Sequence, residues 1–366
     1  MQSSPSESMN PAYPEVSVIV PARNEEACLE ACLISLTAQQ GVPFEIIVVD
    51  DGSRDRTAAI ARSFAGVTLI DAGPLPEGWS GKSNAACTGA QQARGQWLLF
   101  TDADTVHLPG SLARALAEAK RSGAEMLSYS PEQELRGFVE RAVMPVIFAE
   151  LAATYKPRAV SDPSLPAAAA NGQYLLITRT AYDAVGGHAA VATCLLEDVE
   201  LARAVKRSGR RIRFRFGGDA VRTRMYRSFA QLVEGWTKNL ALLFKAPARR
   251  ALMRLLEFLA IVVGTALLAV GLHFGDIQLV VPAGIAVALI YLNFLLRIRK
   301  AHAGVASSAL AVFGLAIFSY LLLRSKLYYT WHRSVTWKGR IYSTVDPKPQ
   351  SERRTSTCPA GERWSI

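Results

Sequence analysis

An Asp-x-Asp sequence in the first third of the chain has the residue types and spacing for binding a metal diphosphate. Asp102 and Asp104 flank the small Ala103 and follow an apolar run, residues 97–101, that is typical of a buried strand. Two carboxylates at this spacing can face one hard cation together with the oxygens of a diphosphate. We therefore interpret the motif as a nucleotide-diphosphate site with Mg²⁺ or Mn²⁺, since both ions prefer oxygen ligands. A solvated turn after the strand is the alternative.

A second pair of aspartates follows another apolar run. Asp50 and Asp51 come after residues 44–49, and α/β sheets bind ligands at the carboxyl ends of their parallel strands. An aspartate there can accept a hydrogen bond from the N3–H of uracil or from ribose hydroxyls. The alternative is local, with Asp51 capping the next turn through the amide of Ser53.

Two further residues are placed to reach the same nucleotide. Glu25 lies in the segment from Pro21 to Glu26 that ends the first strand, so it can approach the base and the ribose. Lys82 follows a glycine and opens a helix, where its charge and the helix N-terminal amides can meet phosphate. The Gly-Lys-Ser triplet alone is a weak signal, because it lacks the upstream glycine of a Walker A loop.

A pair of acidic residues far downstream of the Asp-x-Asp suits base catalysis. Glu197 and Asp198 begin a helix, where carboxylates also interact favourably with the helix dipole, so helix capping is the alternative. In the functional interpretation, a carboxylate opposite the leaving diphosphate takes the proton of an acceptor hydroxyl as that oxygen attacks the sugar. The histidines form no catalytic pattern.

Alternating strands and helices must position these residues. Their alternation predicts a parallel sheet with right-handed crossovers, and thus an α/β fold. The helix at 136–155 is amphipathic and either lies on a membrane surface or packs in the core. The predicted strands are 16–20, 44–49, 67–70, 96–101, 125–129, 174–177 and 211–216, and the predicted helices are 26–40, 55–64, 78–94, 112–120, 136–155, 196–208 and 229–244.

Three long apolar segments fill most of the remaining chain. A helix needs about 20 residues to cross a bilayer, so the second segment is long enough and the others need their flanks. Buried helices of a soluble domain are the alternative, which three such runs in series disfavour. The predicted organisation is a disordered N-terminus (1–14), a catalytic domain (15–245), a membrane region (250–325) with helices at 255–273, 277–297 and 306–324, and a basic, partly disordered tail (326–366).

The net charge of +10 does not indicate a nucleic-acid binder, because the basic residues cluster beside the apolar segments. The N-terminus lacks the apolar core of a signal peptide. We therefore expect a multi-pass protein of the inner (plasma) membrane with a cytoplasmic catalytic domain. Two crossings agree with the positive-inside rule. A third would place the basic residues after 323 outside, so the third segment is re-entrant or interfacial, or it is an exception.

The order of these motifs resembles that of family 2 glycosyltransferases with the GT-A fold. The resemblance covers about residues 16–244. Gly-Trp-Ser-Gly-Lys from 78 and the apolar segments are most similar to the lipid-modifying branch, including carotenoid, hopanoid and ceramide-type glycosyltransferases. The ordered motifs are Pro-Ala-Arg-Asn-Glu-Glu from 21, Val-Val-Asp-Asp-Gly-Ser from 48, Gly-Lys-Ser-Asn-Ala from 81, Asp-Ala-Asp from 102 and Glu-Asp-Val-Glu-Leu from 197.

The resemblance implies a metal-dependent transfer from a UDP-sugar in a single inverting displacement. Asp198 would be the general base, and Asp102 and Asp104 would bind the metal and the diphosphate. The predicted nucleotide-sugar site is completed by Pro21, Glu25, Asp50, Asp51, Lys82, Ala103 and Glu197, of which the resemblance itself implies Pro21, Glu25 and Asp51.

One departure from the family narrows the predicted acceptor. Processive polysaccharide synthases carry Gln-x-x-Arg-Trp after the base, whereas residues 231–236 read Gln-Leu-Val-Glu-Gly-Trp. This difference favours transfer of one hexose to a lipid hydroxyl. The alternatives are transfer to a polyprenyl phosphate, which is already an anion and needs no base, and a catalytically silent membrane protein that binds nucleotide sugars.

Overall fold

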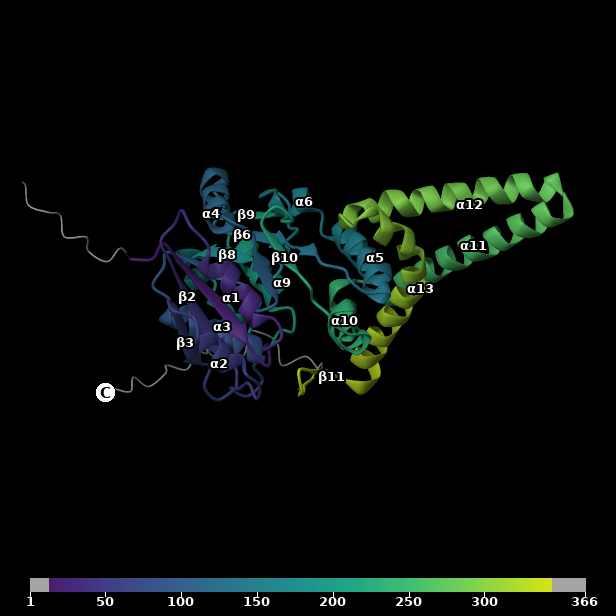
Figure 1. Ribbon diagram of the computed structural model, residues 1–366. Helices are drawn as coiled ribbons and strands as arrows, with labels where there is room; N and C mark the ends of the chain where they lie inside the picture. Colours follow the sequence, from purple (N-terminus) through teal and green to yellow (C-terminus); the bar gives the residue numbers. More distant parts are fainter. Residues whose placement is uncertain (1–12, 344–366) are drawn as a thin grey trace, which may run out of the picture. The chain divides into compact units, whose positions relative to one another are not determined.

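The computed structural model describes residues 13–343 (Figure 1). The predicted disorder of residues 1–12 and of the tail beyond 343 lies outside the described residues. The chain forms two compact units. Within the described residues, the first unit contains 13–131 and 160–222, and the second contains 132–159 and 223–343.

A seven-stranded mixed sheet forms the centre of the first unit, in the order β3-β2-β1-β4-β8-β6-β9. Neighbouring strands are parallel, except that β8 runs antiparallel to both β4 and β6. This GT-A-like sheet confirms the predicted fold class. The strands are β1 Val16–Ala22, β2 Phe44–Asp50, β3 Val67–Asp71, β4 Trp97–Phe100, β6 Met126–Ser130, β8 Leu175–Thr178 and β9 Ile212–Phe216.

Helices follow most of these strands. Strand β1 is buried on both faces, since Val18 and Val20 pack with Leu29 and Leu33 in one core cluster while Ile19 faces the opposite way. The helices are α1 Leu29–Thr37, α2 Thr57–Arg62, α3 Gly81–Gln92, α4 Ser111–Ser122, α7 Arg179–Ala184, α8 Gly187–Ala190 and α9 Glu197–Arg207, and β5 Thr105–His107 is a short strand. At the boundaries between the units lie α6 Pro157–Ser161, β7 Glu132–Gln133 and β10 Val221–Thr223.

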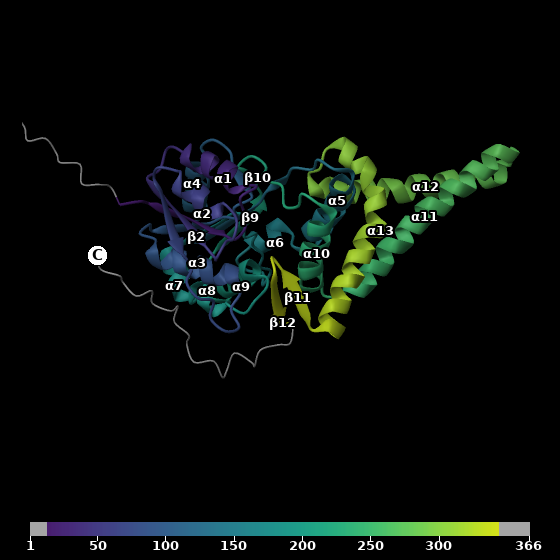
Figure 2. The same cartoon turned by 60° about the horizontal axis from the view of Figure 1, so that its bottom comes forward.

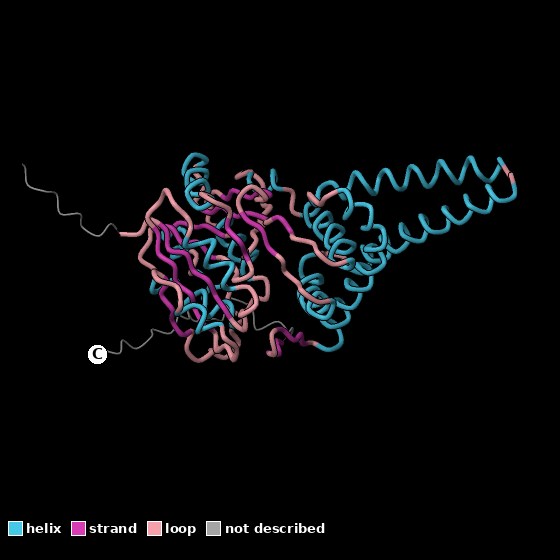
Figure 3. The backbone as a smooth tube through the Cα atoms, in the orientation of Figure 1, coloured by secondary structure: helices cyan, strands magenta, loops and turns pink. Residues whose placement is uncertain are grey.

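The second unit is a helical bundle with a small β-hairpin. Helices α11 and α12 form a hairpin of their own, which Figures 2 and 3 show as two long helices joined by a tight turn. At that turn Gly275 adopts a positive φ of 69°, and the side chain of Asp276 caps α12. The elements are α5 Phe138–Thr154, α10 Phe229–Leu243, α11 Pro247–Phe274, α12 Ile277–Ile298, α13 Val305–Leu327, β11 Ser334–Trp337 and β12 Arg340–Ser343.

Three helices of the second unit are long and apolar enough to cross a membrane, as the sequence predicted. They differ in burial: 44% of the apolar stretch of α13 is buried inside the protein, against 11% for α11 and 6% for α12. Helix α5 packs against α13, and its Val143, Val146 and Ile147 are fully buried. Of the two interpretations of the segment 136–155, the structure favours core packing.

Candidate active site

The carboxyl ends of β1, β2 and β4 meet at one edge of the sheet. Strands β1 and β2 pair so that Ala22 lies opposite Asp50. The amide of Asp51 continues the ladder by donating to the carbonyl of Ala22 at 2.9 Å, and the amide of Thr101 donates to the carbonyl of Ile19 at 3.1 Å. The two aspartate motifs therefore leave the sheet from the same edge.

Lys82 joins two of the predicted motifs. It is the second residue of α3, and the hydroxyl of Ser80 begins that helix by accepting from the amide of Ser83 at 3.0 Å. Its ammonium lies 2.7 Å from Oδ1 of Asp102 and 3.0 Å from Oε1 of Glu197. The Asp-x-Asp loop and the start of α9 are thus brought together around one positive charge.

The acidic neighbours of Lys82 keep its ammonium protonated. Burial by itself would lower the pKa of the ammonium, but Asp102, Glu197 and Asp198 raise that pKa well above its ordinary value. A group of this kind stays protonated throughout the physiological range and can meet phosphate oxygens as a fixed cation.

Asp198 has the environment of a general base. Its Oδ2 accepts from the amide of Gly172 at 2.8 Å, and its Oδ1 accepts from the amide of Val199 at 2.8 Å. Burial and the adjacent charge of Glu197 raise its pKa to about 6, against the lowering effect of Lys82 and the two amides. A carboxyl with this pKa is largely ionised at neutral pH and is more basic than an ordinary aspartate.

Gly172 is a site residue that the sequence analysis missed. A Cβ at this position would lie 2.8 Å from Nζ of Lys82 and 3.5 Å from Oδ2 of Asp198. Because β8 runs antiparallel to β4, the residues before β8 reach the edge where β4 ends, and Thr101 there donates to the carbonyl of Gln173 at 2.8 Å. The only sequence signal was an Asn-Gly pair, which is typical of an ordinary turn.

Three carboxylates gather around the buried thiol of Cys32. Burial raises the pKa of this thiol, and the charges of Asp104, Asp102 and Glu25 raise it further. The thiol also lies 3.8 Å from the carbonyl of Asp102. Ala103, the spacer of the Asp-x-Asp, is buried in the core and anchors the loop. The charges of both aspartates of the motif thus act on one thiol, while Asp102 also contacts the ammonium of Lys82.

Asp102 and Asp104 offer the hard oxygen donors that Mg²⁺ and Mn²⁺ prefer, so the residues fit a divalent cation. In the described part of the chain, residues 13–343, no group of three or more His, Cys, Asp or Glu side chains is arranged to hold a metal. The further ligands would come from the diphosphate of the donor and from water. This is the usual situation for magnesium sites that serve phosphates.

In the second aspartate pair, the turn cap is made by Asp50 and not by Asp51. Oδ1 of Asp50 accepts from the amide of Ser53 at 3.1 Å, so the predicted turn cap belongs to Asp50 and its assignment to Asp51 was wrong. Asp51 is buried, and Arg23 donates to its carbonyl at 2.9 Å while lying 3.9 Å from Oδ2. Arg23 stands in the Pro-Ala-Arg-Asn-Glu-Glu motif but was not singled out from the sequence.

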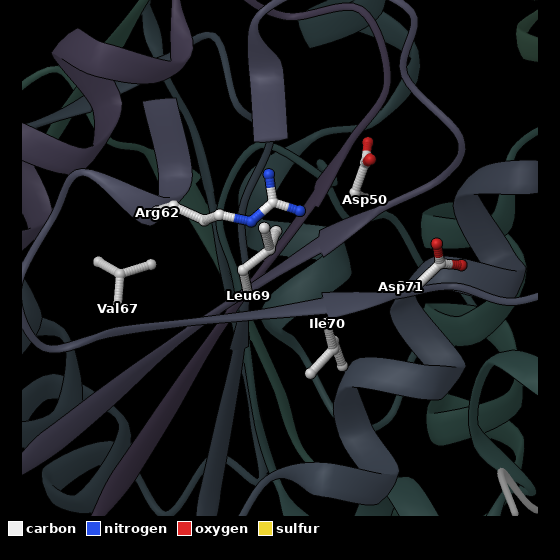
Figure 4. Close-up of a pocket in the computed structure, with 6 residues that line it drawn as sticks. All are labelled: Asp50, Arg62, Val67, Leu69, Ile70 and Asp71. Carbon is white, nitrogen blue, oxygen red and sulfur yellow. The ribbon is translucent and has the colours of Figure 1, made fainter. Parts of the chain in front are cut away.

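Asp50 lines a separate pocket at the ends of β2 and β3. This pocket has a volume of about 390 Å³, and Figure 4 shows Asp50, Arg62 and Asp71 among its lining residues, with Val67, Leu69 and Ile70. Lys82 and the two acidic motifs around it do not line this pocket. Asp50 therefore lines a pocket that the residues around Lys82 do not share.

The remaining predicted residues lie between these groups. Pro21 is part of β1, at the edge where that strand ends. The amide of Glu25 donates to the hydroxyl of Thr57 at 2.8 Å, and its Oε2 lies 3.1 Å from the thiol of Cys28. The segment from Pro21 to Glu25 is thereby fixed beside α2, next to the end of β2.

Part of the chain is similar to proteins of known activity. Residues 17–166 match the family model described as glycosyl transferase family 2. The 4,4'-diaponeurosporenoate glycosyltransferases of Staphylococcus aureus strains MRSA252 and USA300 are each 31% identical over 242 residues, which is 64% of this chain and 62% of the relative. The chain thus spans less than two thirds of the length of these curated relatives.

A solved structure shares the fold. The mannosyltransferase of Pyrobaculum calidifontis, solved in complex with GDP-mannose and Mn²⁺, superimposes with a TM-score of 0.51 at 17% identity. The match covers 88% of this chain and 89% of that one. The GT-A-like sheet, the ordered acidic motifs and the family match over residues 17–166 point the same way, and this part of the chain is similar to glycosyl transferase family 2.

Proposed function

We propose that this chain transfers a hexose from a UDP-sugar to a lipid hydroxyl, with inversion at the anomeric carbon and with Asp198 as the general base. The observation that carries the proposal is the environment of Asp198. Its pKa of about 6 suits proton removal near neutral pH, and Lys82 connects its surroundings to the Asp-x-Asp loop. A base and a diphosphate site are thus built around the same ammonium.

Each remaining residue has a role in this proposal. Pro21, Glu25 and Asp51 line the edge where the nucleoside would bind, with Asp50 on the side of the separate pocket. Lys82 would contact the diphosphate, and Ala103 and Glu197 would shape its surroundings. Mg²⁺ or Mn²⁺ held by Asp102 and Asp104 would neutralise the charge of the departing diphosphate. The related fold of the mannosyltransferase bound to Mn²⁺ supports this assignment.

The lipid acceptor is supported by the relatives and by the apolar helices. The curated relatives are named for 4,4'-diaponeurosporenoate, a carotenoid-type acid. Helices α11 and α12 expose apolar side chains along their length, which suits membrane insertion. We place the protein in the inner (plasma) membrane, with the nucleotide-sugar site in the cytoplasm.

A second candidate function follows from the name of these relatives. The suffix "-oate" denotes a carboxylate, so their acceptor is an anion. An anionic acceptor, either a carboxylate or the polyprenyl phosphate considered above, attacks without losing a proton and needs no general base. Asp198 would then be dispensable for the chemical step, which separates the two candidates experimentally.

The test uses membranes containing the full chain, radiolabelled UDP-sugars and Mn²⁺ or Mg²⁺, with radioactivity in the organic phase as the readout. The variants are Asp104→Ala and Asp198→Asn. The matched control is Glu200→Gln, because Glu200 lies on the same helix and pairs with Arg203 instead of the site.

Each outcome selects one hypothesis. Loss of lipid label in both variants, with the control active, supports transfer to a hydroxyl by base catalysis. Label that is lost in Asp104→Ala but survives Asp198→Asn identifies an anionic acceptor. If UDP binds tightly but no donor yields labelled lipid or free sugar, the chain is a silent nucleotide-sugar binder and the proposal fails.

A further inference from the structure

A buried ion cluster fixes the base of the α11–α12 hairpin, by which we mean the first turns of α11 and the last turns of α12. Arg297, near the end of α12, lies 2.8 Å from Oε2 of Glu257 in α11. Arg254 of α11 and Arg297 lie 3.0 Å and 3.4 Å from Oε1 of Glu150, whose side chain is 2% exposed. Helix α5, which carries Glu150, is therefore held at this base.

The first half of α13 also lies at the base. It begins at Val305, shortly after α12 ends at Ile298. In its middle, Gly314 approaches α5 so closely that a Cβ there would lie 1.9 Å from the carbonyl of Ala142. Ser319 then donates to the carbonyl of Ala251 at 2.9 Å, in the second turn of α11.

The second half of α13 returns to the helix that precedes the hairpin. Ser325 donates to the carbonyl of Thr237 in α10 at 2.6 Å and accepts from the amide of Ala241 at 2.8 Å. Arg324 adds a hydrogen bond of 3.1 Å to the hydroxyl of Thr237. Only residues 244–246 connect α10 to α11, so the end of α13 lies beside chain that has not yet entered the hairpin.

These contacts decide the direction of α13. A third crossing would carry its last residues to the level of the hairpin tip, which lies about 35 Å along α11 from Ala251 at 1.5 Å per residue. Instead, one end of α13 is tied to the end of α12 and the other to α10. Hydropathy alone does not separate this arrangement from a crossing, because both require an apolar helix of the same length.

The exposed face of α13 suits the membrane interface. Its bundle-facing side is buried, while Phe313, Tyr320, Leu323 and Leu327 are exposed along one stripe of the helix. An exposed apolar stripe that ends among basic residues suits contact with the acyl chains of one leaflet beside its anionic headgroups. The basic residues at and beyond the end of this stripe are Arg324, Lys326, Arg333, Lys338 and Arg340.

We infer that the chain crosses the bilayer twice, through α11 and α12, and that α13 lies in the interfacial region of the leaflet where the hairpin begins. The β11–β12 hairpin is then on the same side as the chain preceding α11. This arrangement removes the conflict with the positive-inside rule that a third crossing creates. The basic residues at the end of α12 and the basic residues after residue 323 then lie on the same side of the membrane.

The test compares single cysteines in the full chain, labelled with a membrane-impermeant maleimide in intact and in lysed cells. Asp276→Cys reports the hairpin tip, and Thr336→Cys reports β11, where Thr336 is exposed. The unsubstituted chain gives the background of its own cysteines. We expect the two positions to label on opposite sides, Asp276→Cys in intact cells and Thr336→Cys only after lysis. Labelling of both positions in intact cells, or of neither position until lysis, would overturn the inference.

A second measurement addresses the contact with lipid. The Leu323→Cys variant is labelled with a fluorophore and reconstituted into two kinds of nanodisc. In one kind the lipids carry bromine near the headgroup, and in the other they carry it near the end of the acyl chain. An interfacial helix predicts at least twofold stronger quenching by the shallow bromine. Stronger quenching by the deep bromine would refute the interfacial position even if the cysteine labelling agreed with two crossings.

Discussion

Replacing Gly172 with alanine tests whether the cluster around Lys82 acts in catalysis. The added Cβ would lie 2.8 Å from Nζ of Lys82, whereas ordinary contacts begin at 3.4 Å, so the ammonium has to retreat. Retreat stretches its contacts of 2.7 Å to Asp102 and 3.0 Å to Glu197. The fold tolerates this change, because the displaced atom is the end of a flexible side chain.

The expected loss is kinetic. A misplacement of about 1 Å at a reacting centre costs up to about 100-fold in rate. The required retreat is smaller, so we expect kcat to fall about 10- to 100-fold, or about 1.4 to 2.7 kcal/mol of activation free energy. The midpoint of thermal unfolding in detergent should change by no more than about 2 °C, since the folded state loses little.

The assay is the rate of label transfer to the organic phase at saturating donor, with thermal unfolding measured on the same preparations. Gly304→Ala is the matched control, because no atom lies within 4 Å of a Cβ built on Gly304. Wild-type kcat in Gly172→Ala would show that the position of Lys82 does not matter to the reaction. A fall in kcat matched by a fall in the folded fraction would show that Gly172 acts only on stability.

Four further results are expected. The acidic limb of kcat/KM should follow the Asp198 pKa of about 6, with activity lost as the base is protonated below it, and Glu197→Gln should move that limb to lower pH because it removes a like charge. EDTA should abolish transfer, and added Mn²⁺ or Mg²⁺ should restore it. Glu150→Gln should lower the free energy of unfolding of the detergent-solubilised protein by about 3 to 5 kcal/mol, because the partly buried Arg254 and Arg297 lose the charge of a carboxylate that is 2% exposed. Gly314→Ala should cost about 1 to 3 kcal/mol in the same measurement, since its Cβ would collide with the carbonyl of Ala142.

The first three of these results each have a simple contradiction. An acidic limb that stays in place in Glu197→Gln would mean that another group is titrating. Full activity in EDTA would remove the divalent metal from the proposal. The control for Glu150→Gln is Glu30→Gln, a change at an exposed position on α1. Equal free energies of unfolding for the two variants would show that the ion cluster contributes nothing to stability.

The main strands and the acidic motifs at their ends could be predicted because parallel strands are buried and their carboxyl ends share an edge. The predicted strands agree with the structure to within two residues at each end. Short elements such as β5, α7 and α8 were missed, since they are too short to show a period. Asp102, Glu197 and Asp198 converge because β4 and α9 point them toward one ammonium.

The contributions of Gly172 and Arg23 could not be predicted from the chain alone. Gly172 precedes its strand, and an apolar run does not reveal which way the strand runs in the sheet. The turn cap predicted for Asp51 is made by Asp50, because neighbouring residues of an extended chain face opposite sides, so an error of one residue changes the assignment. The path of α13 depends on contacts with α5 and α10, which hydropathy does not contain.

If α11 and α12 cross the bilayer as we propose, the tight turn between them is the part of the described chain that reaches the far side. Only Gly275 and Asp276 separate the two helices. A protease or an antibody acting from that side would reach only this short turn of the described chain. No large domain of the described chain would anchor the hairpin on that side. With two crossings, residues 13–343 would offer the far leaflet only this turn with which to receive a glycolipid. A product destined for that leaflet would need a separate transporter to carry it across.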